Sequence, residues 1–157
     1  MTRRERSFSM THHHSGGIPA KMYSRKVVIR YPADFAEKPI IYELVKKHDL
    51  LLNILKARIF PRREGVLVLE LSGEKENFDN GIRYLKGQGL SVEPLSKSVS
   101  QNEEKCVHCG ACTAFCPTGS LSFDRESWKV LFEPERCNGC ELCVSACPVH
   151  AMEVNLL

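Results

Sequence analysis

Long hydrophobic runs are missing from this sequence of 157 residues. The run LLNIL stops at Lys56, and the run VLVLELSG is interrupted by Glu70. A membrane-spanning helix needs roughly 18 or more consecutive apolar residues, so we expect no membrane span. No hydrophobic segment follows Arg3 and Arg4 either, which argues against a secretory or twin-arginine export signal. These absences favour a cytoplasmic location.

A nucleic-acid-binding motif is also missing, although the charge is unevenly divided along the chain. Residues 1–100 contain 18 Lys and Arg against 11 Asp and Glu, whereas residues 101–157 contain 4 against 8. The cations of the first part are spread over every predicted element and do not gather on one stretch. We therefore expect a solvated basic surface and no nucleic-acid partner.

Cysteine is absent from the first 105 residues, and all eight cysteines follow in two similar runs. The run CVHCGACTAFCP begins at Cys106, and CNGCELCVSACP repeats its spacing 31 residues later, from Cys137. Every cysteine falls on this repeat, so none is left over as a lone nucleophile or redox thiol. A reducing cytoplasm disfavours disulfides, and short intervals between cysteines favour metal ligation.

The spacing of the cysteines distinguishes between three kinds of site. A structural zinc site closes with four ligands, usually from two separated Cys-x-x-Cys pairs, and has no use for the additional cysteines. Cysteines three residues apart on a tight loop are poorly placed for several disulfides. The run C-x2-C-x2-C-x3-C-P instead matches the ligand spacing of 4Fe-4S clusters. We predict two 4Fe-4S clusters.

The fourth cysteine of each run is expected to serve the other run's cluster. Pro117 and Pro148 favour an extended conformation in the preceding cysteine, which directs it away from its own loop. The predicted ligands of cluster 1 are Cys106, Cys109, Cys112 and Cys147, and those of cluster 2 are Cys137, Cys140, Cys143 and Cys116. This part of the chain has few large apolar side chains, so we expect it to unfold without iron. His108 and His150 are interpreted as exposed loop residues.

The rest of the chain divides into an arm, a folded domain and a linker. Residues 1–24 are polar and lack periodicity, so we expect a disordered arm in which His12, His13 and His14 bind no metal. Hydrophobic periodicity predicts strands at 26–31, 51–60, 64–73 and 90–95, and helices at 38–50 and 74–89. We predict an α+β chain with a ferredoxin-like β-α-β-β-α-β domain at 25–95, a linker at 96–104 and a cluster domain at 105–157.

Both domains resemble known families. Residues 105–157 resemble bacterial-type two-cluster ferredoxins, because every ligand, both prolines and the repeat are present. Residues 25–95 resemble the NIL domain, which is named for an Asn-Ile-Leu triplet that stands here as Asn53, Ile54 and Leu55. A NIL domain joined to a ferredoxin is itself a known architecture.

The resemblance to the NIL family implies more than the spacing can. NIL domains are also found at the C-terminus of methionine-importer ATPases, where they bind methionine and regulate transport. The resemblance thus implies a methionine-like or homocysteine-like ligand, or a homodimer contact through the sheet. Ferredoxins of this architecture are associated with anaerobic sulfur assimilation that leads to homocysteine. No pocket motif in this sequence identifies the ligand contacts.

These observations leave three hypotheses open. The first is a ferredoxin that is not an enzyme and carries electrons between redox partner proteins, with the NIL domain sensing a sulfur amino acid or docking a partner. The second is an accessory iron–sulfur subunit of a sulfide-incorporating pathway toward homocysteine and methionine. The third is a binding module in which the clusters are purely structural.

Overall fold

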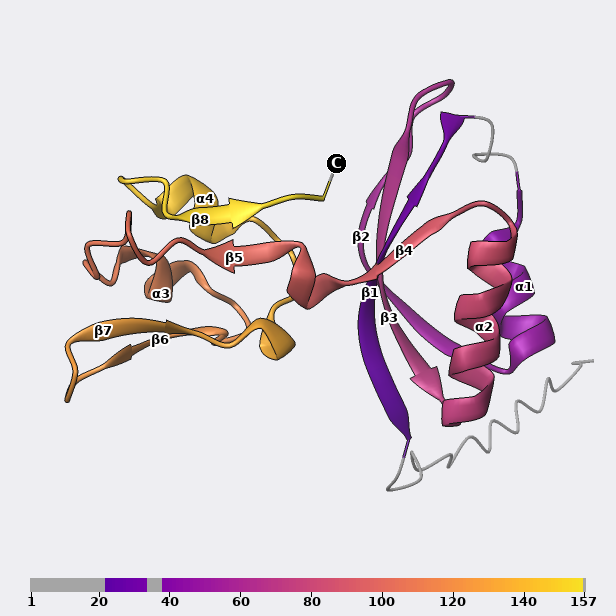
Figure 1. The fold of residues 1–157 in the computed structure, drawn as a ribbon, viewed down its shortest axis with the longest axis horizontal. Helices are drawn as coiled ribbons and strands as arrows, with labels where there is room; N and C mark the ends of the chain where they lie inside the picture. The colour runs from indigo at the N-terminus through magenta and orange to yellow at the C-terminus, as the bar shows by residue number, and fades with distance from the viewer. Residues whose placement is uncertain (1–21, 34–37, 157) are drawn as a thin grey trace, which may run out of the picture.

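Residues 22–33 and 38–156 are described by the structure, a computed structural model, in which they form two modules joined by a short connection (Figure 1). The expected arm lies almost wholly outside these residues, as do His12, His13 and His14. Within the described ranges, no helix is both long and apolar enough to cross a membrane.

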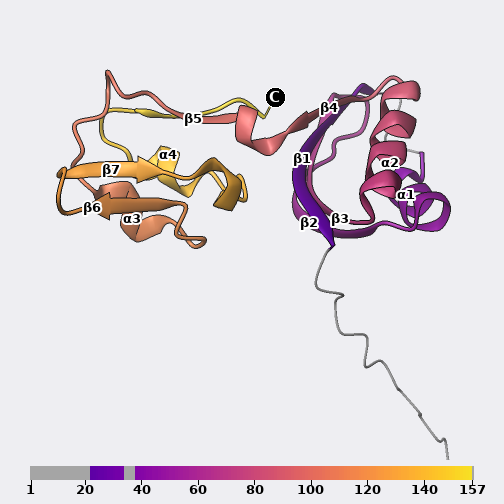
Figure 2. The same ribbon diagram turned by 60° about the horizontal axis from the view of Figure 1, so that its bottom comes forward.

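The first module is a four-stranded antiparallel sheet with two helices on one face (Figure 2). Its strands lie in the order β2-β3-β1-β4. The elements are β1 (Tyr23–Tyr31), α1 (Ile40–His48), β2 (Leu51–Arg58), β3 (Gly65–Gly73), α2 (Lys75–Gly87) and β4 (Ser91–Pro94). The predicted β-α-β-β-α-β order and the α+β class are therefore confirmed.

The two faces of this sheet are buried by different partners. Alternate residues of β1 and β3 pack against the helices, among them Ile29, Leu69 and Leu71, together with Leu44 and Leu85 of the helices. The intervening residues face the other side and pack against the second module. The seam core, the apolar cluster between the modules, contains Val28, Val66, Val68, Leu95, Val99, Cys112, Leu121, Val130, Met152 and Leu156.

Burial on both faces explains why β3 reads as an almost continuous apolar run. Its residues Val66 to Leu69 have at most 7% of their surface exposed. A dimer through the helix-free face would have to displace the second module. In the part of the chain that the structure describes, β2 and β4 are the outer strands of the sheet, and no further strand pairs with their outer edges.

The second module consists of short elements around the cysteine runs. Its elements are η2 (Leu95–Lys97), β5 (Val99–Gln101), α3 (Ala111–Phe115), β6 (Leu121–Asp124), β7 (Lys129–Phe132), η3 (Pro134–Arg136), α4 (Leu142–Ala146) and β8 (Met152–Val154). Strand β5 pairs with β8, β6 pairs with β7, and α3 packs against α4.

The segment expected as a linker is more ordered than its composition suggests. Part of it forms η2 and β5, and Val99 lies opposite Val154 in the antiparallel pair with β8. Ser98 is buried, and its carbonyl accepts a hydrogen bond from the Asn155 N–H at 2.8 Å. The polar composition of this segment does not reveal the pairing, because β8 lies about fifty residues further along the chain.

Candidate iron–sulfur centres

Each run of three cysteines is wound into a loop by two residues with left-handed backbone conformation. In the first loop they are His108, with φ of 51°, and Gly110, with φ of 78°. In the second loop the corresponding residues are Gly139, with φ of 70°, and Glu141, with φ of 66°. The sequence repeat is therefore also a repeat of backbone geometry, although glycine and non-glycine residues exchange places within it.

The fourth cysteine of each run is extended, as the following proline predicted. Cys116 has φ of −81° and ψ of 107°, and Cys147 has φ of −86° and ψ of 110°. Both therefore leave the short helices α3 and α4 at an angle to the loops. Helices α3 and α4 pack together, and each extended cysteine lies near a thiol of the other run, Cys147 near Cys112 and Cys116 near Cys137.

The first predicted set of thiols is close enough for its members to influence one another. Burial raises the pKa of the Cys112 thiol, and the neighbouring thiols of Cys147, Cys106 and Cys109 raise it further. Cys147 belongs to the other cysteine run, so the structure brings together residues from both halves of the repeat. All four members of the predicted cluster 1 set lie in one neighbourhood.

The second predicted set lines a single cavity. The four cysteines on its wall are Cys116, Cys137, Cys140 and Cys143. Burial, followed by the thiols of Cys137 and Cys140, raises the pKa of Cys143 to about 11. Four thiols that face one space match the number of ligands that a 4Fe-4S cluster takes from protein.

Hydrogen-bond donors surround several of these sulfur atoms. The Ala151 N–H donates to Cys147 Sγ at 3.2 Å, the Gly139 N–H to Cys137 Sγ at 3.4 Å, and Gln101 Nε2 to Cys106 Sγ at 3.3 Å. Burial would raise the pKa of Cys147, but hydrogen bonds from the backbone outweigh it and lower that pKa. Such donors stabilise thiolates and orient them as metal ligands. The residues present therefore fit two cubane clusters.

His108 makes a contact that its position between two ligands did not predict. Its Nδ1 accepts a hydrogen bond from the Val130 N–H at 3.2 Å and lies 3.7 Å from Cys106 Sγ. The side chain is partly buried, whereas the sequence suggested an exposed residue. It thereby fastens the first loop to β7.

The second loop is held against the sheet by Lys26. The Lys26 ammonium donates to three consecutive carbonyl oxygens, of Glu135 at 3.3 Å, Arg136 at 3.0 Å and Cys137 at 2.8 Å. These carbonyls end the η3 turn that leads into the loop. A single charged side chain from β1 thus positions the backbone of Cys137.

Two further cations from β2 contact the same loop. Lys56 Nζ lies 2.7 Å from the Glu141 carboxylate and 3.4 Å from the Gly139 carbonyl oxygen, and Arg58 lies 2.9 Å from the same carboxylate. The sequence did not assign these residues a role. The available signal was the pattern of cations at alternate strand positions, opposite an acidic second half.

The Asn-Ile-Leu triplet of β2 is divided between different environments. Asn53 lies opposite Glu70 and lines a surface hollow with Leu51 and Ser72. Ile54 is exposed, and Leu55 packs against the seam core. The register of β2 shifts between Ile54 and Lys56, so the strict alternation expected for this strand is interrupted.

The fold and the cysteine sets together define an iron–sulfur protein with a NIL module. Residues 25–94 match the NIL domain family, and residues 98–148 match the 4Fe-4S dicluster domain family. The prediction of a NIL domain fused to a two-cluster ferredoxin is confirmed. The chain carries two 4Fe-4S clusters as its cofactors.

Curated relatives indicate the particular family. The chain is 39% identical to the L-aspartate semialdehyde sulfurtransferase iron-sulfur subunit of Methanocaldococcus jannaschii, over 64% of this chain and 75% of that protein. It is 34% identical to the subunit of the same name from Methanosarcina acetivorans, over 68% of this chain and 79% of that protein. The chain belongs to the family of iron–sulfur proteins that includes these two archaeal subunits.

A further similarity covers a shorter stretch of the chain. The methionine import ATP-binding protein MetN of Coxiella burnetii is 43% identical over 63 residues, which cover 38% of this chain and 18% of MetN. That protein shares only a small part of its length with this chain.

Proposed function

We propose that this chain is the electron-carrying subunit of an enzyme that transfers sulfur to a small aldehyde or related amino-acid precursor. The observation that carries the proposal is the union of two four-thiol sets with a NIL module, in a chain similar over most of its length to two sulfurtransferase iron-sulfur subunits. In this proposal the chain has no active site of its own. It supplies electrons to a catalytic partner protein.

The ligand sets of the two clusters are part of the proposal. Cluster 1 takes Cys106, Cys109, Cys112 and Cys147, and cluster 2 takes Cys137, Cys140, Cys143 and Cys116. The mutual influence of the first four thiols and the shared cavity of the second four support this division. When bound, each cluster accepts and releases one electron.

The protein's own residues control the surroundings of this chemistry. Backbone N–H groups and Gln101 stabilise the ligand thiolates, and buried side chains of the seam core exclude water from one side of both loops. Cys109 and Cys140 are exposed, so each loop also has a side open to a partner protein. Electrons can therefore enter through one loop and leave through the other.

In this proposal the NIL module determines which partner protein or small ligand the chain binds. It either docks the catalytic partner or binds a methionine-like or homocysteine-like ligand. The surface hollow that Asn53 lines on β2 is the candidate site for such a ligand. A homodimer through the edge strand β2 is compatible with the covered face of the sheet. Titration with methionine and homocysteine, and measurement of the oligomeric state, separate these roles.

The experiment that tests the proposal combines metal analysis with reconstituted catalysis. Protein purified without oxygen should contain about eight iron atoms per chain and give reducible S = 1/2 signals by electron paramagnetic resonance. Together with the catalytic subunit, sulfide and L-aspartate semialdehyde, it should raise product formation in proportion to its reduction. Two clusters that cannot be reduced in the range of biological potentials would favour a purely structural role instead.

A further inference from the structure

A cavity of about 400 Å³ opens at the seam between the two modules. It lies beside the end of β4: Pro94 is opposite Val27, so among the described residues no strand pairs with residues 23–26 of β1 on that side. Helix α2 forms one wall, and the η3 turn of the second module forms another. The volume falls within the roughly 300–1,000 Å³ of small-molecule sites, which often lie at domain boundaries.

The floor of this seam cavity is apolar and well fixed. It is formed by Tyr23, Phe78, Ile82 and Val92. Phe78 is 7% exposed and belongs to the helix-side core, and its ring meets that of Tyr23 edge-on at a centroid distance of 4.9 Å. Such a floor can take an apolar chain without rearrangement of the core.

Most of the charged groups on the rim already have partners. The Arg25 guanidinium lies 3.1 Å from the Glu135 carboxylate, and the Glu93 carboxylate lies 2.8 Å from the Arg30 guanidinium. The ammonium of Lys26 is used by three carbonyl groups of the second module. These contacts leave the carboxylates of the rim neutralised.

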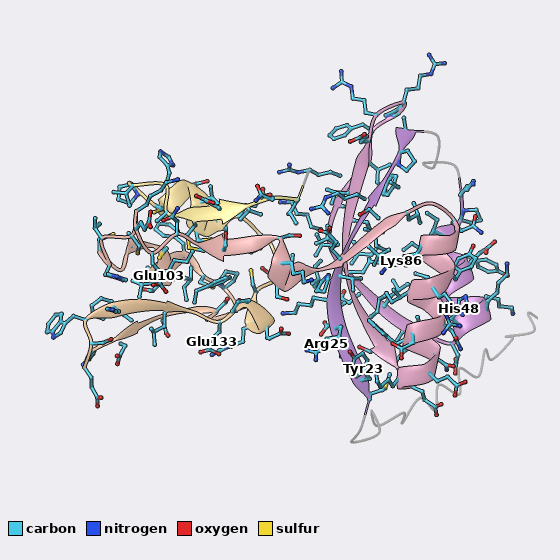
Figure 3. All side chains as sticks on the ribbon, in the orientation of Figure 1. Tyr23, Arg25, His48, Lys86, Glu103 and Glu133 are labelled. Atoms are coloured by element: carbon cyan, nitrogen blue, oxygen red, sulfur yellow. The ribbon has the colours of Figure 1, made fainter. Side chains whose placement is uncertain are left out.

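Lys86 is the exception on this rim. It stands in the last turn of α2 beside the apolar floor, and Figure 3 labels it together with Tyr23 and Arg25. Within the described residues its ammonium makes no hydrogen bond or ion pair. The cavity therefore combines an apolar floor with a lysine at its mouth whose ammonium has no hydrogen-bond partner among the described residues.

We propose that the seam cavity binds a small monocarboxylate with an apolar chain, which lies on the floor while its carboxylate meets Lys86. This site is distinct from the Asn53 hollow and goes beyond the electron-carrying role. Its position also links it to cluster 2, because Glu135 on its wall precedes Cys137 by two residues. Reduction of that cluster adds a negative charge, so the carboxylate should bind the oxidised protein more tightly. By linkage, bound carboxylate should make that cluster harder to reduce.

Calorimetry on the full-length protein with both clusters in place tests the site, with hexanoate as the probe and hexylamine as its charge-reversed counterpart. Hexanoate should bind the wild-type protein and hexylamine should not. Lys86→Glu should weaken hexanoate binding about tenfold or more and create binding of hexylamine, since attraction is replaced by repulsion. Arg83→Glu is the matched control: it lies on the same helix, its contact is with Asn80, and it changes the overall charge equally.

The possible results distinguish binding at this site from a general effect of charge and from no binding. Hexanoate binding that is lost equally in Arg83→Glu would show a general charge effect and overturn the site. Absence of hexanoate binding to wild-type protein, in both redox states, would overturn it as well. A redox titration with and without hexanoate tests the link to cluster 2, and an unchanged reduction potential of cluster 2 would overturn that link. None of these results depends on the catalytic partner, so the electron-carrying proposal can fail or stand separately.

Discussion

The two cysteine loops repeat each other in sequence and in backbone geometry, yet they lie in unlike surroundings. The loop that begins at Cys137 is fastened to the NIL module by Lys26, Lys56 and Arg58. The loop that begins at Cys106 is fastened within its own module, by Gln101 and by the contact of His108 with Val130. Fusion to a second module has thus made two similar sites different.

This difference has an electrical consequence. A nearby cation stabilises the extra negative charge that a cluster acquires on reduction, and the low dielectric constant of the seam strengthens the effect. Lys26 places its charge at the carbonyl of Cys137, whereas the part of the chain that the structure describes shows no hydrogen bond from the sheet to residues 106–112. Cluster 2 should therefore be reduced before cluster 1.

Removal of iron should have the largest effect of the changes considered, because it abolishes both cluster sites. The second module should lose its fold, since each run depends on ligands from the other, while the sheet and its helices remain. Circular dichroism and amide hydrogen exchange after anaerobic chelation would measure this. Retention of protection in residues 98–156 without iron would contradict it.

Replacement of the fourth cysteine of each run by alanine tests which cluster that cysteine binds. Cys116→Ala should remove a ligand of cluster 2, and Cys147→Ala should remove a ligand of cluster 1. Each variant should retain about half of the iron, or about four atoms per chain. The remaining signal in Cys147→Ala should keep the higher potential. The opposite assignment of potentials would show that each run holds its own cluster.

Leu95→Ala tests the packing of the seam beneath the second loop. Leu95 is 1% exposed, and a methyl group built on Gly139 would lie 3.2 Å from its Cδ1, so the truncation leaves a cavity directly under that loop. We expect a loss of about 2–5 kcal/mol in the free energy of unfolding, measured by denaturant. Leu131→Ala, at a half-exposed position of the same module, should lose far less.

Lys26→Gln should reduce the difference between the reduction potentials of the two clusters. It removes the charge while retaining a side chain that can donate hydrogen bonds, so the higher potential should fall by tens of millivolts, an order of magnitude set by Coulomb's law with screening. The lower potential should remain nearly constant. Lys46→Gln, on a helix of the opposite face, is the control and should change neither.

Glu141→Gln should produce the smallest effect, and with the opposite sign. Its carboxylate neutralises Lys56 and Arg58 beside the second loop, so its removal leaves their charge uncompensated and should raise the higher potential slightly. The first loop has Gly110 at the corresponding position and lacks this carboxylate. A fall in potential in this variant would show that the cations do not act on the cluster.

The sequence predicted the parts of the molecule that repeat or alternate. Cysteine spacing indicated the cluster type, and hydrophobic periodicity placed all six elements of the NIL module. The extended conformation of Cys116 and Cys147 followed from the prolines. These features are encoded by neighbours along the chain.

What the sequence did not predict depends on residues far apart in the chain. The expected linker pairs with β8, and the register shift in β2 turns Leu55 toward the seam. The role of Lys26 depends on carbonyl groups more than a hundred residues away. The cations of the first half looked like an ordinary solvated surface, because nothing local shows which module will cover them.

The most direct test of this account is a redox titration of the full-length protein, followed by electron paramagnetic resonance. The account predicts two one-electron steps at different potentials, of which only the upper step moves in Lys26→Gln. Two steps that move together in this variant, or a protein that contains a single zinc ion in place of iron, would contradict it.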